Sequence, residues 1–215
     1  MHPLSRRQFL SATLPLCVAA LPLCAADSAP NKEWIPLGDG QNFGPWQVTD
    51  FAGHGEVKVG GGEWVLEAGL DLTGINLNKA PVEMGYELEL EARRLTGGDF
   101  FCGLTFPVGT ARCTFVVGGW GGTVVGISSI DGQDASENPS SQSRRFETGR
   151  WYRVGVRVEP ARLQAFLDGE KVVDVELAGR TIGMRLGEIE LSCPLGVSSF
   201  RTKAALRGIR YRLLA

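Results

Sequence analysis

The sequence has few of the residues from which many catalytic and metal sites are built. Its 215 residues include two histidines, five cysteines and three methionines. The cysteines form no Cys-x-x-Cys pair, so we do not expect a zinc site. Beyond the N-terminal segment His54 is the one histidine, and no Gly-x-Ser-x-Gly pattern accompanies it. A serine-hydrolase triad is therefore not indicated either.

The chain also lacks an excess of basic charge and a long hydrophobic run. Lysine and arginine total 22 against 24 aspartates and glutamates, which gives a formal charge of −2. Nucleic acid is not an expected partner, because phosphates are bound by clustered lysines and arginines. The apolar stretch Leu14–Leu23 is interrupted by Pro15 and Pro22. It is shorter than the ~20 residues of a membrane-spanning helix, so we expect no membrane span after cleavage.

The N-terminus instead carries the pattern of an export signal. Residues 5–10, SRRQFL, match the twin-arginine signature, and residues 24–26, CAA, supply small residues for cleavage before Asp27. This predicts a signal peptide over residues 1–26 and a periplasmic or secreted protein. Two alternatives stay open. One is an uncleaved apolar helix, and the other is lipidation at Cys17 or Cys24, although neither cysteine follows the small residue that lipoprotein cleavage prefers.

No window beyond the signal keeps apolar residues at helical spacing, and 29 glycines and 11 prolines separate short apolar runs. In Tyr86–Arg93, apolar and charged residues alternate as in a half-buried strand. The segments expected to be strands are Trp34–Leu37, Trp46–Val48, Val57–Val59, Glu63–Leu66, Tyr86–Arg93, Phe100–Phe106, Cys113–Val117, Val124–Ile130, Trp151–Val158, Leu163–Leu167, Lys171–Leu177, Ile189–Ser192, Gly196–Phe200 and Ala205–Leu214.

About a dozen short strands without intervening helices indicate an all-β protein with antiparallel sheets, which means a sandwich or a barrel. We find no internal repeat and no boundary for a second domain. The prediction is a single β-sandwich domain over residues 34–215, preceded by a disordered polar leader over residues 27–33. On the Tyr86–Arg93 strand, Tyr86, Leu88 and Leu90 should face the core, as should Tyr152, Val154 and Val156 on their own strand.

The stretch from Asp99 to Asn138 combines an aromatic residue, a run of glycines and several carboxylates. Three predicted strands are joined by a Pro-Val-Gly turn and by a glycine-rich corner, Gly118–Gly122, which carries Trp120. An acidic loop follows at once. We expect Trp120 and this loop to lie at the same end of a groove. Trp120 is then either a stacking platform for a sugar ring or a buried cap on the sandwich.

Two features of this stretch leave alternatives open. If Pro107 and Val108 form a two-residue turn, Cys102 and Cys113 lie opposite each other and a disulfide is feasible; otherwise they are buried free thiols. The acidic loop offers hard oxygen ligands for calcium, or it is simply solvated. No other cofactor is expected.

The order of several motifs resembles that of the 3-keto-disaccharide hydrolase domain family, over nearly all of residues 34–214. The opening WIPLGDG (34–40), the paired strands YELELE (86–91) and DFFCGLTF (99–106), and the closing ALRGIR (205–210) match its pattern. So does the series GRWY (149–152), FLDG (166–169) and VVD (172–174). The resemblance implies a jelly-roll β-sandwich of the concanavalin A-like lectin/glucanase type, with a carbohydrate groove on one concave face.

The resemblance also implies a carbohydrate or an oxidised glycoside as ligand. We then expect an exported hydrolase or lyase of 3-keto-glycosides, or a non-catalytic carbohydrate-binding module with the same groove. Catalysis by two carboxyl groups would require them within ~5–10 Å of each other. The carboxylates of Glu87, Glu89 and Glu91 share one strand face, as in laminarinase-type glucanases, but a solvated charged face explains them equally. The candidate catalytic residues are Asp131, Asp134, Glu137, Glu91 and Asp99, and the candidate carbohydrate-binding residues are Trp120, Asn138, Arg144, Arg157 and His54.

Overall fold

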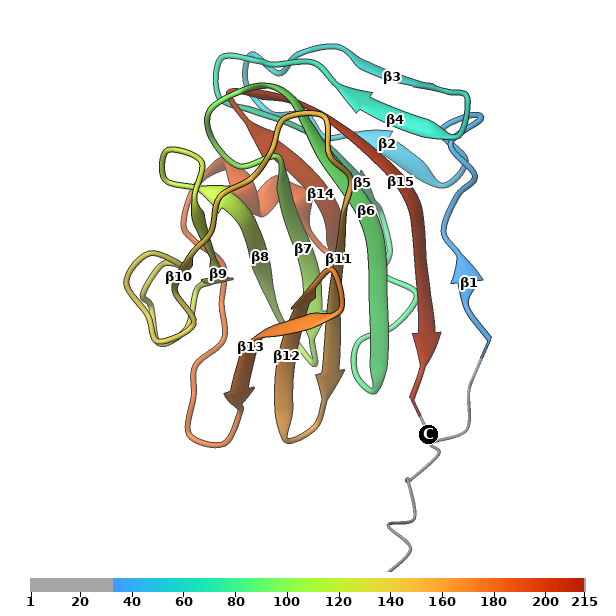
Figure 1. The fold of residues 1–215 in the computed structure, drawn as a ribbon. Helices are drawn as coiled ribbons and strands as arrows, with labels where there is room; N and C mark the ends of the chain where they lie inside the picture. The colour runs from blue at the N-terminus through green and yellow to red at the C-terminus, as the bar shows by residue number, and fades with distance from the viewer. Residues whose placement is uncertain (1–32, 215) are drawn as a thin grey trace, which may run out of the picture.

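The computed structural model describes residues 33–214, which form two antiparallel sheets lying one in front of the other (Figure 1). The predicted antiparallel sandwich is confirmed. The first sheet has the order β13-β12-β11-β6-β15-β4-β3, with β1 also paired to β15, and the second has the order β10-β9-β8-β7-β14-β5-β2. The first sheet comprises β1 (Ile35–Pro36), β3 (Val57–Gly60), β4 (Glu63–Leu66), β6 (Tyr86–Gly97), β11 (Tyr152–Glu159), β12 (Arg162–Leu167), β13 (Glu170–Glu176) and β15 (Thr202–Leu213). The second comprises β2 (Trp46–Val48), β5 (Leu72–Leu77), β7 (Cys102–Val108), β8 (Ala111–Gly119), β9 (Val124–Ser128), β10 (Gln142–Ser143) and β14 (Leu195–Phe200).

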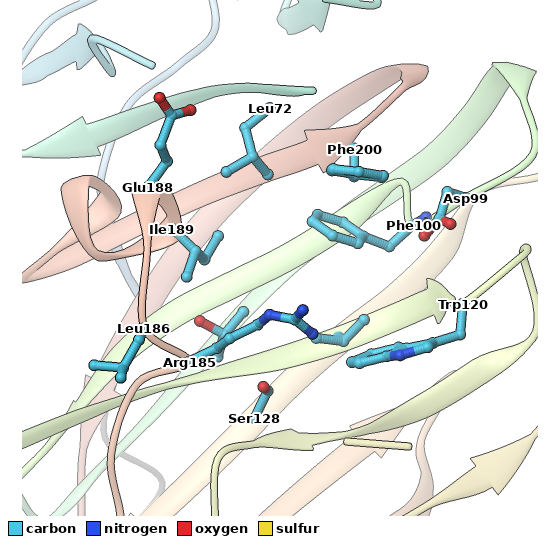
Figure 2. A pocket seen from close by; sticks show the side chains of 12 residues that line it. Leu72, Asp99, Phe100, Trp120, Ser128, Arg185, Leu186, Glu188, Ile189 and Phe200 are labelled. Atoms are coloured by element: carbon cyan, nitrogen blue, oxygen red, sulfur yellow. Dashed lines mark hydrogen bonds between the residues drawn. The ribbon is translucent and has the colours of Figure 1, made fainter. Parts of the chain in front are cut away.

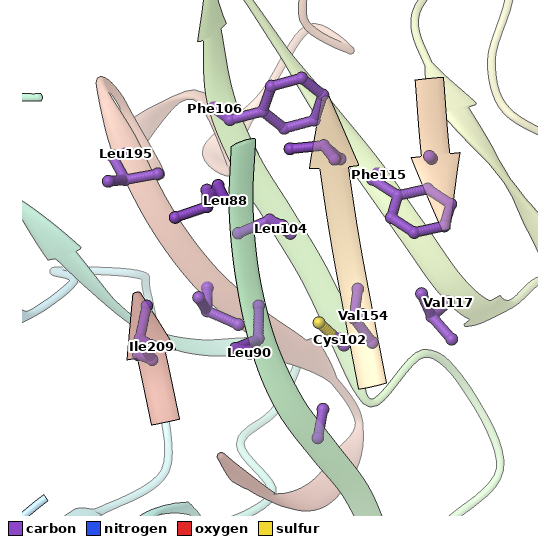
Figure 3. Close-up of a cluster of buried hydrophobic side chains, with 14 of the residues drawn as sticks. Leu88, Leu90, Cys102, Leu104, Phe106, Phe115, Val117, Val154, Leu195 and Ile209 are labelled. Carbon is purple, nitrogen blue, oxygen red and sulfur yellow. The ribbon is translucent and has the colours of Figure 1, made fainter. Parts of the chain in front are cut away.

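The core lies between the sheets and is built by the predicted alternation. Leu88 and Leu90 of β6 and Val154 of β11 point toward Leu104 and Phe115 of the second sheet (Figure 3). All five side chains are at most 2% exposed. The core assignments for β6 and β11 are confirmed, because every second residue of these strands faces inward.

Two segments differ from the sequence prediction. The segment Ile189–Ser192 is not a strand but lies in the 3-10 helix η1 (Glu188–Ser192). Conversely, β5 was not expected, although it lies in the second sheet between β14 and β2. All six of its residues, LTGINL, are buried, so the strand has no exposed polar face and no clear alternation. The two-residue strand β10 was also missed.

The hairpin between β7 and β8 turns two residues later than predicted. Val108 pairs with Ala111, so the turn residues are Gly109, whose φ is 62°, and Thr110. Cys102 therefore lies opposite Val117, and Cys113 lies opposite Phe106. The disulfide alternative is wrong, and both cysteines are buried free thiols whose pKa is raised by burial.

The outer face of the second sheet is partly covered by the segment that contains η1. Backbone hydrogen bonds link Ser129 and Gly183 in both directions, at 2.7 and 3.2 Å. Farther along, the Ser192 hydroxyl lies 2.8 Å from the Thr105 hydroxyl of β7. This covering segment, residues 178–194, forms one wall of the groove described below. Within residues 33–214, no helix has the length and apolar character needed to cross a membrane.

Candidate functional site

A groove of about 310 Å³ lies on the outer face of the second sheet. Its floor includes the side chains of Thr114 and Val116 on β8 and of Ser128 on β9, all buried. The lining residues are Leu72, Asp99, Phe100, Thr114, Val116, Trp120, Ser128, Arg185, Leu186, Glu188, Ile189 and Phe200, and Figure 2 shows them from close by. Aromatic side chains and Asp99 stand on one side of the groove, and the covering segment supplies the other.

The glycine-rich corner presents Trp120 to this groove. Trp120 has a φ of 47°, and its side chain is 40% exposed, so it is not a buried cap on the sandwich. The backbone N–H of Gly121 donates to Asp99 Oδ2 at 3.0 Å, and that of Phe100 donates to Asp99 Oδ1 at 2.7 Å. The Asp99 carboxylate thus holds the corner at a fixed position beside the groove.

A buried arginine from the first sheet supports the same corner. Arg94 of β6 is 7% exposed, and its Nη2 donates to the backbone carbonyls of Asp99, Gly118 and Gly122 at 3.0, 3.5 and 3.2 Å. Burial lowers the pKa of this guanidinium. Gly118 has a φ of 80°, which favours glycine, and a Cβ there would also come within 2.8 Å of Arg94 Nη2.

Arg185 brings a positive charge into the groove. Its guanidinium carbon lies 5.9 Å from the centre of the Trp120 ring, and its Nη1 donates to Asp134 Oδ2 at 2.7 Å. The second Asp134 oxygen accepts a hydrogen bond from the Ser128 hydroxyl at 3.0 Å. Asp134 therefore orients Arg185 and Ser128 at the edge of the groove and does not itself line it.

The rest of the acidic loop serves other purposes. Asp131 binds Arg180 at 2.7 Å and the Thr181 backbone N–H at 2.8 Å, and these hydrogen bonds, the backbone one first, lower its pKa. Asn138 is buried and donates to the backbone carbonyls of Ile127, Gln133 and Asp134, so its role is to shape the loop. Glu137 is exposed and outside the groove. Of the loop, Asp134 borders the groove through Arg185, and Asp131, Glu137 and Asn138 do not line it.

The glutamates of β6 lie on the opposite side of the molecule, on the outer face of the first sheet. Glu87 accepts from Arg157 Nε at 2.6 Å, and Glu91 accepts from Arg207 Nε at 2.8 Å. Glu89 accepts from Arg210 Nη2 at 2.6 Å. These carboxylates are paired with arginines across neighbouring strands, so the charged-face alternative is the one that the structure supports. Neither Glu91 nor Arg157 lines the groove.

The remaining predicted contacts also lie elsewhere. Arg144 donates to Glu170 at 2.8 Å. His54 Nδ1 lies 2.8 Å from the carbonyl oxygen of its neighbour Gly55. Of the ten predicted site residues, Asp99 and Trp120 line the groove, and Asp134 borders it through Arg185.

The family model for the 3-keto-α-glucoside-1,2-lyase-like domain matches residues 33–202 of the sequence. The chain belongs to this family. The resemblance read from its motifs is confirmed. A comparison with curated proteins finds no match.

Solved structures similar to this family member are carbohydrate-related sandwich domains. Carbohydrate-binding module CBM66 from Bacillus subtilis aligns with a TM-score of 0.54 at 10% identity, over 78% of this chain and 95% of the module. The Crh5 transglycosylase in complex with NAG aligns with a TM-score of 0.56 at 12% identity, over 87% and 85%. Domain 4 of the extracellular arabinanase AbnA from Geobacillus stearothermophilus, in complex with arabinotriose, gives 0.50 at 16% identity, over 81% and 84%. These similarities establish the jelly-roll fold.

In this lyase-like domain, the sequence reasoning missed several groove residues. Arg185, Leu186 and Glu188 lie in the covering segment, and Phe200 ends β14. The available signal was Leu186 next to charged and glycine residues in a stretch without strand alternation. Such a leucine is not expected in a core, but single exposed leucines are common on protein surfaces, so this signal is not specific.

The described part of the chain, residues 33–214, holds no group of three or more His, Cys, Asp and Glu side chains placed to bind a metal ion. Asp131 and Asp134 are each engaged by a different arginine, Arg180 and Arg185, which does not favour a shared cation. The calcium site stays a prediction. The predicted signal peptide, residues 1–26, lies outside the described residues. So does the predicted leader, residues 27–33, apart from Glu33. Both stay predictions.

Proposed function

We propose that this protein binds a glycoside in the groove and acts as a lyase on its 3-keto form. Family membership over residues 33–202 supports the chemistry. The observation that carries the proposal is that Trp120, Arg185 and Asp99 line one groove. An aromatic face, a cation and a carboxylate are the groups that bind a sugar ring, polarise its ketone and remove a proton from it.

The reaction follows from the position of the ketone. A carbonyl at C3 acidifies the proton on C2, and a base removes that proton. The electron pair left on C2 forms a C1–C2 double bond, and the C1–O bond to the aglycone breaks with its electrons on oxygen. That oxygen then takes up a proton and leaves as an alcohol. No oxidant or reductant is consumed.

Two groove residues fit the two roles this reaction requires. In the proposal, the Arg185 guanidinium, oriented by Asp134, hydrogen-bonds the C3 oxygen and stabilises the negative charge that develops there. Asp99 is the base, since it lies near Trp120 in Figure 2. Each Asp99 oxygen accepts one backbone hydrogen bond, which leaves lone pairs for the substrate proton.

The alternative is a non-catalytic carbohydrate-binding module. The same hydrogen bonds favour it, because they attach both Asp99 oxygens to the glycine-rich corner and give the carboxylate a structural role. Asp134 is likewise engaged, by Arg185 and Ser128. Glu188, whose side chain accepts a 3.3 Å hydrogen bond from the Ala52 N–H, is the competing candidate for the base.

The test is incubation of the mature protein with α-glucosides and their 3-keto forms. Elimination produces a double bond conjugated with the ketone, and its ultraviolet absorbance reports turnover. Arg185→Gln should lower kcat/KM about 10²–10³-fold. Asp99→Asn should lower kcat by more than it raises KM if Asp99 is the base, whereas loss of its hold on the corner would mainly raise KM.

Matched controls come from the opposite face. Arg207→Gln and Glu91→Gln remove the same chemical groups from an ion pair remote from the groove and should leave kcat/KM unchanged. If Glu188→Gln abolishes turnover and Asp99→Asn does not, Glu188 is the base. If the wild-type protein binds the glycosides in a Trp120-dependent way and forms no product, the binding-module alternative is correct.

We also propose that the protein is exported through the twin-arginine route, on the basis of residues 5–10. Changing Arg6 and Arg7 together to lysine should retain the protein in the cytoplasm. Cell fractionation checks this, and the wild-type chain is the reference. Unchanged appearance of the double variant in the periplasm or medium would contradict the proposed route.

A further inference from the structure

The groove has two chemically different ends. One end, which we call the sugar end, holds Trp120 and the guanidinium of Arg185, whose carbon lies 5.9 Å from the centre of the Trp120 ring. The other, the apolar end, holds Leu72, Leu186 and Ile189. Figure 2 shows Leu186 and Ile189 away from Trp120, with Arg185 starting beside Leu186 and extending toward Trp120, and with Phe100 and Phe200 between Leu72 and Asp99.

The apolar end presents a hydrophobic surface to water. Leu186 is 89% exposed, although it lines the groove. Beside it, Ile189 is half-buried, while Leu72 is only 7% exposed. Because the Leu186 side chain is almost fully exposed, it contributes little to the stability of the fold. Covering it with an apolar part of a ligand would favour binding.

The aromatic pair continues this surface toward the sugar end. The rings of Phe100 and Phe200 are stacked, with centroids 5.9 Å apart and planes 26° apart. Both side chains are half-buried and line the groove. Aromatic ligands add stacked or edge-to-face contacts to such rings beyond simple burial.

Few polar groups accompany the apolar end. In Figure 2 the labelled polar side chains near this end are Glu188, close to Leu72, and Arg185, which starts beside Leu186 but extends toward Trp120. A second sugar would lose hydrogen bonds from its hydroxyls to water and find few partners here. An aromatic group has no hydroxyls that would lose hydrogen bonds to water, and the side chains of this end would cover it on several sides.

We infer that the apolar end is an aglycone subsite and that the ligand is a glycoside with an aromatic aglycone, not a disaccharide. This inference rests on the proposed function, since the sugar must occupy the sugar end. In a lyase reaction the aromatic group departs with the C1 oxygen as a phenol. The hydrophobic contacts hold it beside the bond that breaks.

The experiment compares three α-glucosides with the same sugar: methyl glucoside, maltose and 2-naphthyl glucoside, each also in its 3-keto form. Calorimetry with the mature protein should show the naphthyl glucoside binding about tenfold more tightly than the other two. Leu186→Ala should reduce this advantage at least about threefold and leave methyl glucoside binding unchanged.

Leu191→Ala is the matched control. Leu191 lies in η1 and is 51% exposed, but it does not line the groove, so its truncation should change none of the affinities. Both leucines are exposed, and both variants should fold as the wild type does. Trp120→Ala should weaken all three glucosides.

The outcomes separate the two proposals. If methyl glucoside binds in a Trp120-dependent way and the naphthyl group brings no advantage, or if maltose binds most tightly, the aglycone subsite is refuted and the groove function stands. If Leu186→Ala and Leu191→Ala have the same effect, the subsite is also refuted. If no glucoside binds, both proposals fall.

Discussion

The outer faces of the two sheets carry similar residue types but use them differently. On the first sheet, Glu87, Glu89 and Glu91 of β6 lie between arginines of β11 and β15. On the second sheet, Asp99 and Arg185 line an open groove. Charges that repeat at every second position of a strand meet opposite charges on the neighbouring strands. The charges of Asp99 and Arg185, which line the groove, come instead from loops beside the sheet.

The tryptophans show the same contrast. Trp151 lies between two guanidiniums, with Arg93 at 4.3 Å and Arg207 at 4.2 Å from its ring centre. Trp120 is contacted by Arg185 at 5.9 Å and remains 40% exposed. An aromatic face already covered by cations is a poor platform for a sugar. Trp120, at the glycine-rich corner beside the groove, stays more open to solvent, which is what the proposed function requires.

The largest effect should come from the core beneath both faces. Leu88→Ala should lower the free energy of unfolding by about 2–4 kcal/mol, because the 2% exposed side chain leaves a cavity. Urea denaturation measures this loss. A loss below about 0.5 kcal/mol would mean that the inner and outer faces of β6 are reversed.

On the outer face of the first sheet, which we call the ionic face, the ion pairs of Glu87 and Glu91 should contribute differently to stability. The Glu87 side chain is 10% exposed and contacts both Arg157 and Arg212, whereas the Glu91 side chain is 37% exposed and pairs with Arg207. Glu87→Gln should lower the free energy of unfolding by about 1–3 kcal/mol, because it removes a buried carboxylate that pairs with two arginines. Glu91→Gln should cost less than about 1 kcal/mol. Equal losses in urea denaturation would mean that burial does not distinguish the pairs.

A pair of tryptophan variants sharpens the comparison of the faces. Trp120→Ala should weaken glycoside binding about tenfold or more with little change in melting temperature, because the side chain lies on the surface. Trp151→Ala should leave the affinity unchanged, since its ring stacks on arginines of the other face. Titration calorimetry on both variants decides the matter. A loss of affinity in Trp151→Ala alone would move the binding surface to the first sheet.

The smallest effect concerns the pH dependence of the ionic face. Hydrogen bonds from Lys171 and Arg162 lower the pKa of Asp174 from 3.8 to about 2. A carboxyl group with a lowered folded-state pKa stabilises the fold above its unfolded pKa, and this contribution is lost as the pH falls toward about 2. The melting temperatures of wild type and Asp174→Asn should therefore differ at pH 5 and converge as the pH approaches 2. A difference that stays constant over this range would contradict the assignment.

Much of the fold could be predicted because its strands alternate. The segment Glu63–Leu66 coincides with β4, and the inward residues of β6 and β11 were assigned correctly. By contrast, β5 is buried throughout and contains Gly74 and Asn76, so neither alternation nor composition marks it. The Asp131–Asn138 loop attracted attention by its charge, yet Asn138 serves the loop and Asp134 acts through Arg185.

By itself the sequence determined the all-β class, the inner and outer faces of the long strands, and the family. The strand faces depend on patterns within ten or so neighbouring residues, where the two-residue period of a strand is directly readable. The class and the family follow from the order of such segments along residues 34–214. The tertiary structure alone decided which charges are paired and which line a groove. Arg185 meets Asp134 and Trp120 only because the covering segment crosses the second sheet. Such contacts join residues 51 positions or more apart, and no local pattern encodes them.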